Sequence, residues 1–284
     1  MADRRALFLT APGWIWLTVF FLLPCGVLFA YAFGTTSYTA VNFGTSLKNF
    51  GDVLTTPTLQ TVVLRSLTTG LAVATLTVLL AFPLAYAITL GPFARHATPI
   101  LLLVVVSLFS AFIVRIYAWR TILGSSGVVN TFLMQIGLTT EPLDELLYSR
   151  FAVVLTLTSV LIPVAVLPLT AALSGVPRSL IEAARNMGTT APQAFRRVTL
   201  PLASGGIGSA FALTFVVGAG DFITPQLVGG PSSQMAGSAI SSRFGISFDW
   251  PQGAAIAFTL VAGMVAVLVA LRLLMRAAGM RDRP

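Results

Sequence analysis

The chain has 284 residues, of which 56% are hydrophobic and only 9% charged, and its mean hydropathy is +0.90. Charged residues make up about 25% of an ordinary soluble domain, so the composition excludes that class. Anionic lipid headgroups account for the net charge of +8, and we expect membrane lipids rather than nucleic acid as the partner of this charge.

Six apolar blocks are long enough, at about 1.5 Å of rise per residue, to cross or nearly cross a hydrocarbon core of about 30 Å. We expect membrane spans at about 14–34, 66–90, 97–114, 151–173, 201–220 and 252–273. Because backbone polar groups in lipid must be satisfied within each segment, the sequence predicts an all-α, polytopic membrane protein. Residues 1–284 then form a single transmembrane domain.

The first block has some features of a cleavable signal peptide. Arg4 and Arg5 precede it, and Ala30-Tyr31-Ala32 imitates a cleavage site. The apolar run from Trp14 to Phe33 is long for a signal peptide, however, and five further blocks follow it. We therefore expect the first helix to be retained.

Prolines and small residues mark several of the later blocks. The second block contains Pro83, and the fourth contains Pro163 and Pro168, which predicts kinks or close contacts with neighbouring helices. The fifth opens on Pro201, and small residues follow at 205, 206, 208 and 209. This spacing permits close packing of helix backbones, and equally flexure during a conformational cycle.

The connection 115–150 is longer than most. Its stretch 128–138 is short and apolar, which predicts a helix lying at the membrane interface. At its start, Tyr117 and Trp119 lie among arginines, a pattern typical of an interfacial belt with snorkelling side chains; a substrate contact is the alternative. With one histidine, His96, and one cysteine, Cys25, we expect no metal site and no intrachain disulfide.

The positive charges predict the orientation. If the N-terminus lies in the cytoplasm, the inside segments carry eleven of the 17 basic residues, namely Arg4, Arg5, Arg95, Arg178, Arg185, Arg196, Arg197, Arg272, Arg276, Arg281 and Arg283. Most of the acids fall on the outside segments. This bias favours both termini in the cytoplasm.

The inside segment 174–200 is the longest of its kind and has the pattern of two short helices. After Pro177, the positions Leu180, Ala183, Ala184 and Met187 form one narrow apolar face, and Arg178, Glu182 and Arg185 are spaced for mutual pairing. Gly188 suits a left-handed helix end, and Thr190 with Gln193 resembles a capping box for a second helix through Arg197. Such a pair fits a lipid surface as well as a groove on a partner protein.

The same residues resemble a known family. The segment is similar to the EAA loop of binding-protein-dependent ABC permeases, whose pattern is E-A-A-x3-G-x9-I-x-L-P. Here the pattern is matched by Glu182-Ala183-Ala184, then Gly188 after three residues, Val198 after nine more, and Leu200-Pro201 after one more. Only valine in place of isoleucine departs from that pattern. The resemblance implies a type I ABC importer permease of the bacterial inner membrane, whose loop 174–200 docks on a cytoplasmic ATPase.

Further segments are similar to the spermidine/putrescine-type permeases within this family. They are Val114 to Trp119, Ile122 to Gly124, Gly127 to Asn130, Gly220 to Pro231, and Asp249 to Ala255, so the resemblance extends over roughly 60–275. It implies a polyamine cargo. It also implies two ATPase subunits, a second permease subunit, identical or different, and a periplasmic substrate-binding protein.

The sequence excludes a Walker-type ATPase site in this chain. A P-loop needs lysine in G-x4-G-K-[ST], and the sole lysine, Lys48, lies in Leu47-Lys48-Asn49. ATP and Mg²⁺ are therefore expected on the partner ATPases, and the chain is expected to be a transport subunit rather than an enzyme.

A polyamine is a cation, so its path calls for carboxylates or aromatic faces. Asp221, at the end of the fifth span, is the best-placed acid, and Tyr117 and Trp119 are the aromatic candidates. A water-exposed loop position, or an ion pair with Arg243, is the alternative interpretation of Asp221.

Other functions fit the sequence less well. An ion-driven secondary transporter usually carries acids or histidine in mid-span, and an intramembrane enzyme needs clustered nucleophiles and bases. The predicted spans have neither. Within the ABC family, the alternative cargoes are another small cation, an amino-acid derivative or an organophosphonate.

Overall fold

The computed structural model describes residues 2–37 and 40–277 and divides into two compact units. Unit 1 comprises residues 1–63 and 239–261, and unit 2 comprises residues 64–238 and 262–284. Arg281 and Arg283, which the charge argument assigns to the cytoplasmic side, lie outside the described residues.

Unit 1 contains the N-terminal helix and a small hairpin. Its elements are α1 (Ala2–Leu17), a wide π turn (Thr18–Leu22), α2 (Leu23–Tyr31), β1 (Thr35–Ser37), β2 (Ala40–Asn42) and α3 (Lys48–Thr55). The two strands are antiparallel, with Thr35 opposite Asn42. The Asn49 side chain donates hydrogen bonds to the carbonyls of Ala32 and Gly34, both at 2.9 Å, and so connects α3 to the end of α2. The hairpin is a minor addition to the helical fold that the sequence predicts.

Unit 2 contains most of the remaining helices. They are α4 (Pro57–Thr89, from residue 64 onward), α5 (Ala97–Leu108), α6 (Phe112–Leu123), α7 (Val128–Gln135), α8 (Arg150–Ser174), α9 (Arg178–Asn186), α10 (Ala191–Ala194), α11 (Leu200–Leu202), α12 (Ser204–Gly220) and α13 (Ile223–Val228). Two more helices, α14 (Ala236–Gly245) and α15 (Trp250–Ala277), each contribute residues to both units.

The core of unit 2 is built from α4, α8 and α12. A cluster of buried apolar residues joins them, with alanines at 81, 85, 165, 203 and 210 and larger side chains at Ile88, Leu169 and Leu173. Small residues let the helices approach closely. A Cβ added to Gly206 on α12 would lie only 2.1 Å from the Cβ of Ala172 on α8. At Gly206 the small residue thus serves close packing, one of the two uses that the spacing of small residues permits.

Within the part of the chain that the structure describes, four helical segments are long and apolar enough to span a membrane by themselves: Thr10–Tyr31, Pro57–Thr89, Arg150–Ser174 and Trp250–Ala277. Two bent pairs, Ala94–Leu108 with Phe112–Gln135 and Ala191–Leu202 with Ser204–Gly220, raise the number to six if each counts as one span. The second predicted span starts earlier than expected, because α4 begins at Pro57 and takes in the end of a segment predicted to be polar loop.

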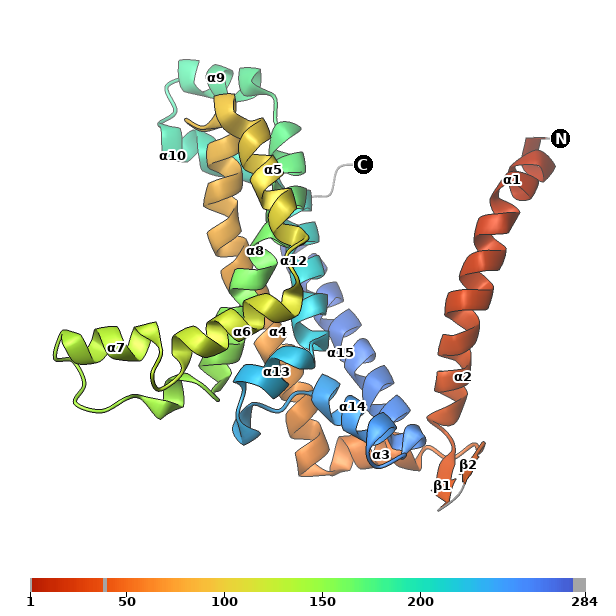
Figure 1. The fold of residues 1–284 in the computed structure, drawn as a ribbon. Coiled ribbons are helices and arrows are strands. Elements are labelled where there is room, and N and C mark those ends of the chain that lie inside the picture. The colour runs from red at the N-terminus through yellow and green to blue at the C-terminus, as the bar shows by residue number, and fades with distance from the viewer. Residues whose placement is uncertain (1, 38–39, 278–284) are drawn as a thin grey trace. The chain divides into compact units, whose positions relative to one another are not determined.

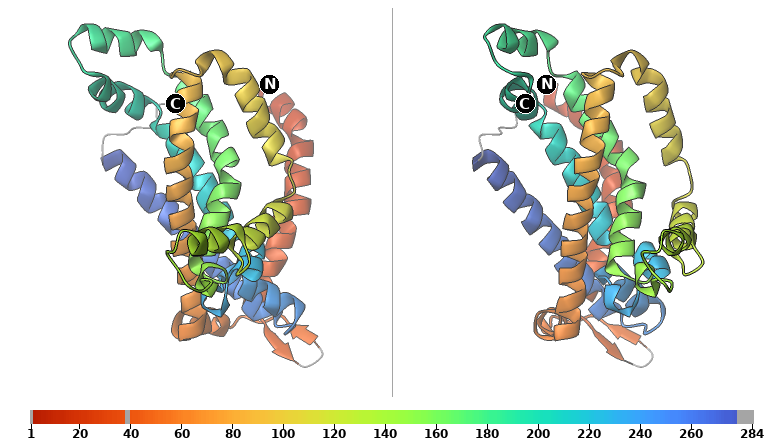
Figure 2. Two further views of the ribbon diagram at one scale, coloured as in Figure 1. Left: turned by 60° about the vertical axis from the view of Figure 1, so that its left-hand side comes forward. Right: turned by 90° about the vertical axis from the view of Figure 1, so that its left-hand side faces the viewer.

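The third predicted span, 97–114, is not one helix. Helix α5 ends at Leu108, residues 109–111 turn the chain, and α6 begins at Phe112. The segment Phe112–Gln135 lies at 88° to Ala94–Leu108. Figure 1 and Figure 2 show α6 running across the direction of α8. The apolar composition continues through the turn, so hydropathy alone does not show where the backbone bends.

The close approach of α12 to α8 predicts a large effect of one added methyl group. We expect Gly206→Ala to lower the stability of the chain by about 1–3 kcal/mol, because Ala172 and the carbonyl of Pro168, which would lie 2.9 Å from the new Cβ, leave no room for it. Gly208→Ala is the matched control, since its Cβ would lie at an ordinary 3.4 Å from Met275. Thermal unfolding of the detergent-solubilised chain measures both, and equal midpoints would refute the packing argument.

Candidate functional site

The segment 174–201 lies at one end of unit 2, with α9 beyond the end of α4 and α10 beside that helix (Figure 1). Helix α9 begins directly after Pro177, as predicted, and its apolar face divides into two parts. Ala184 is 6% exposed and packs inward, whereas Leu180 and Met187 are 47% and 79% exposed. Two large apolar side chains are thus left uncovered on a polar helix. Their exposure favours a partner surface, of protein or lipid, over a purely internal role.

The end of α9 is a Schellman motif built on Gly188. The Gly188 N–H donates to the carbonyl of Arg185 at 3.0 Å, and the Thr189 N–H donates to that of Ala184 at 3.2 Å. Gly188 has φ +87°, the left-handed conformation that the sequence predicts at this position. No atom would lie within 4 Å of a Cβ added to Gly188, so the backbone conformation alone accounts for the glycine.

The second helix of the segment is shorter than predicted. The predicted capping box is present, with the Thr190 N–H donating to Gln193 Oε1 at 3.0 Å, but α10 ends at Ala194 rather than Arg197. A wide π turn, Phe195–Thr199, leads into α11 at Leu200 and Pro201. Pro201 has no N–H to donate to a carbonyl in the preceding turn, and its position is consistent with the altered hydrogen-bond pattern there.

Phe195 attaches this segment to α4, a role that the sequence alone did not indicate. Its ring meets those of Phe82 and Tyr86 edge to face, with centroids 5.9 and 5.7 Å apart. Arg178 provides a second attachment, because its guanidinium donates to the carbonyl of Thr89 at 3.1 Å. In the sequence, Phe195 stands out only as a lone aromatic residue within a short polar segment, which does not identify its partners.

The other residues of the predicted loop motif divide by exposure. Glu182 and Ala183 are exposed, whereas Val198, Leu200 and Pro201 are half-buried where the chain returns to α12. The predicted pairing of Glu182 with Arg178 or Arg185 is absent: among the described residues, the one ion pair within 4.0 Å joins Arg243 to Asp249. The Glu182 carboxylate is therefore available to a partner.

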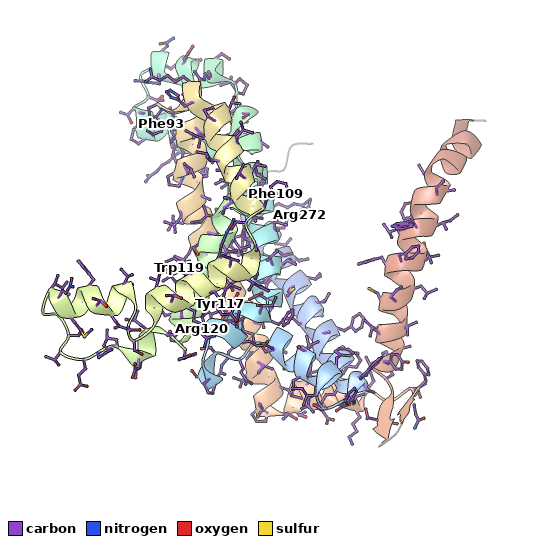
Figure 3. The ribbon with its side chains drawn as sticks, in the orientation of Figure 1. Phe93, Phe109, Tyr117, Trp119, Arg120 and Arg272 are labelled. Carbon is purple, nitrogen blue, oxygen red and sulfur yellow. The ribbon has the colours of Figure 1, made fainter. Side chains whose placement is uncertain are left out.

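The aromatic candidates Tyr117 and Trp119 lie on α6, toward the other end of unit 2 (Figure 3). Trp119 is engaged within the chain: its indole N–H donates to Ser159 Oγ at 2.6 Å, and its ring packs on the core. Arg115, one turn earlier, donates to the carbonyl of Val160 at 3.3 Å. Both bonds reach α8 just before Pro163, whose missing N–H weakens the local helix ladder.

The side chain of Tyr117, in contrast, is 49% exposed. The Arg120 guanidinium lies 6.0 Å from the centre of its ring and also approaches the Tyr148 hydroxyl at 3.4 Å. A cation already faces this ring, so the arrangement resembles the predicted belt of arginines and aromatics more than an empty cation site.

Asp221 follows α12 directly and caps the next helix. Its Oδ2 accepts a hydrogen bond from the Thr224 N–H at 2.9 Å, in the first turn of α13. Burial raises the pKa of the Asp221 carboxyl above its ordinary value, and hydrogen bonds from residues 222–224 oppose that rise. Within unit 1, Arg243 pairs with Asp249 at 3.8 Å.

These residues form two separate candidate sites within unit 2. The segment 174–201 lies at one end, and α6 and α13, with Tyr117, Trp119 and the start of α13 beside Asp221, lie toward the other (Figures 1 and 2). Trp119 packs against the same apolar cluster as Ile223 and Leu227 of α13. The helices that carry Trp119 and follow Asp221 therefore share one part of the core.

The chain is similar over most of its length to known transport proteins. The spermidine/putrescine permease PotB of Haemophilus influenzae is 31% identical over 259 residues, covering 89% of this chain and 88% of the relative. The inner-membrane ABC transporter permease YdcU of Escherichia coli is 34% identical over 70% of this chain and 66% of the relative. A bacterial alginate ABC transporter, solved with a pentasaccharide-bound periplasmic protein, shares the fold, with a TM-score of 0.74, 18% identity and coverage of 98% of this chain and 96% of that one.

The family described as binding-protein-dependent transport system inner membrane component matches residues 56–279, which include both candidate sites. This range agrees with the extent of about 60–275 that the sequence motifs indicated. The predicted fold class is confirmed by the helical structure and its likeness to importer permeases. The chain therefore belongs to this family of inner-membrane proteins and is the permease subunit of an ABC importer.

Proposed function

We propose that residues 174–200 form the coupling loop on which a cytoplasmic ATPase docks. The observation that carries the proposal is the exposure of Leu180 and Met187 beside the unpaired carboxylate of Glu182 on α9. An apolar pair next to a charge suits a groove on a partner protein. Phe195 and Arg178 then transmit a displacement of the loop to α4, because both side chains contact that helix.

The proposed assembly contains two ATPase subunits, this chain, a second permease subunit and a periplasmic substrate-binding protein. In this arrangement both termini lie in the cytoplasm, and the six predicted spans, 14–34, 66–90, 97–114, 151–173, 201–220 and 252–273, belong to one permease domain, 1–284. ATP and Mg²⁺ bind on the ATPases. The basic residues near the proposed cytoplasmic ends support the orientation.

The proposed cargo is a polyamine. The support is the identity of about 31% to a spermidine/putrescine permease along most of both chains. Asp221 offers a carboxylate at the end of α12, and Tyr117 and Trp119 are the aromatic candidates for the path. The alginate transporter with the same fold indicates that the fold itself does not select the cargo, so another small cation, an amino-acid derivative or an organophosphonate is the competing assignment.

Reconstitution tests the proposal. The full chain is purified together with the ATPase, second permease and binding protein of the proposed assembly, and the complex is placed in liposomes. We expect ATP-dependent accumulation of labelled spermidine or putrescine that requires the binding protein. Accumulation of an amino-acid derivative or a phosphonate, with no polyamine uptake, would reject the cargo but keep the coupling loop. If the chain purifies with the second permease but does not bind the ATPase, the assignment of 174–200 as the coupling loop is rejected.

A further inference from the structure

A groove of about 390 Å³ lies beside the first residue of α9, between the end of α4, the start of α5 and the end of α8. Its lining is mainly apolar. The larger apolar side chains, which we call the walls, are those of Ile88, Leu101 and Leu167, and the polar ones, which we call the rim, are those of Thr89, Thr170, Ser174 and Arg178. Ala97 and Ala171 also line it, and their small side chains keep it open.

The rim of this groove is cationic. Arg178 is exposed, and one of its N–H groups donates to the carbonyl of Thr89, which leaves further donors of the guanidinium for a ligand. None of the residues that line the groove is acidic, and Arg178 has no carboxylate within 4.0 Å among the described residues. Arg95, also exposed, directly follows Ala94 of the lining.

An apolar groove with a guanidinium at its mouth has the chemistry of a phospholipid site. Arginine binds phosphate through parallel N–H···O bonds, and basic pockets between membrane helices on the cytoplasmic side attract anionic headgroups. The apolar walls match an acyl chain. A soluble anion such as free phosphate would use the rim but not the walls.

We propose that this groove binds an anionic phospholipid of the cytoplasmic leaflet, with its phosphate on Arg178 and an acyl chain along Ile88, Leu101 and Leu167. The proposal depends on the cytoplasmic location of 174–200 given above. Because Arg178 is the first residue of α9, the lipid contacts the base of the proposed coupling helix. The stability of the contact between α9 and α4 then depends on the lipid composition of the membrane.

Lipid retention by the purified full chain tests the site. The chain is exchanged into detergent containing equal amounts of phosphatidylglycerol and phosphatidylcholine, and bound lipids are counted by native mass spectrometry. We expect the wild type to retain phosphatidylglycerol preferentially, and Arg178→Gln to bind it about tenfold more weakly, the loss typical of a charge-assisted hydrogen-bonded contact. Arg185→Gln is the matched control, because this arginine lies on the same helix, is exposed, and does not line the groove.

A second variant tests the walls without changing charge. Ala171 is exposed and lines the groove, so Ala171→Leu fills it while leaving Arg178 in place, and we expect a similar loss of phosphatidylglycerol. Equal retention of the two lipids by the wild type, an equal loss in Arg185→Gln, or full retention in Ala171→Leu would each overturn the site. Because the assay contains no ATPase and no cargo, these outcomes are separate from failure of the proposed import function.

Discussion

Replacing Gly188 with valine is expected to lower ATP-driven uptake about tenfold while leaving the chain in the membrane. The left-handed conformation at φ +87° costs an L-residue roughly 1–2 kcal/mol, and a β-branched residue tolerates it least. Valine therefore unwinds the Schellman motif and displaces Leu180 and Met187 relative to the rest of the loop. Uptake by proteoliposomes, together with ATPase binding, measures the effect.

Gly188→Asn is the matched control, because asparagine enters the left-handed region more readily than other non-glycine residues. We expect it to retain most of the uptake. No atom would lie within 4 Å of a Cβ at this position, so the valine and asparagine variants differ in backbone preference and not in steric crowding at the Cβ. Glu182→Gln tests the exposed carboxylate independently. Wild-type uptake and ATPase binding in both Gly188→Val and Glu182→Gln would eliminate the coupling assignment.

Asp221→Asn is expected to raise the polyamine concentration for half-maximal uptake about tenfold, the effect of losing one charge-assisted contact. The asparagine carbonyl oxygen still accepts the hydrogen bond from the Thr224 N–H, so α13 keeps its cap. The change thus removes the charge and preserves the local fold. Initial rates of spermidine uptake against concentration measure it.

The pH dependence of uptake is a second, independent test of whether the charge of Asp221 contributes to cation transport. Burial raises the pKa of this carboxyl, so its negative charge is lost as the pH falls through the raised value, and uptake by the wild type weakens on the acid side. Asp221→Asn lacks this titration and should lack that part of the acid decline. Asp144→Asn, which alters an exposed acid bonded to Ser125, is the control. If Asp221→Asn matches the wild type in both assays, the acid is not part of the path.

The backbone of the segment 174–201 was predictable because its signals are local. Pro177, Gly188 and the pair Thr190 and Gln193 each determine a backbone feature within a few residues of themselves, and the structure has all three. The spacing from Glu182 to Pro201 then identified the family. Local patterns do not show which helix face is covered, so the separation of buried Ala184 from exposed Leu180 and Met187 required the structure.

Features that depend on contacts between distant segments were missed. Phe195 gains its role from Phe82 and Tyr86, more than 100 positions earlier, and Trp119 gains its partner from Ser159. Neither pairing leaves a trace in spacing or composition. The bend before α6 was missed for another reason, because its apolar residues continue without interruption where the backbone changes direction.

That bend has a consequence for solvent. Twelve residues of α5 rise only about 18 Å, so the helix ends well short of a full hydrocarbon thickness. In the turn that follows, the N–H groups of Phe109 and Ser110 donate to the carbonyls of Val106 and Ser107 at 3.1 and 3.3 Å, and the side chain of Phe109 is 86% exposed. Irregular backbone within a bilayer persists only where protein or water meets its remaining polar groups. We therefore expect water or a neighbouring subunit to meet the chain at this turn, so that the apolar barrier beside α6 is thinner than the bilayer.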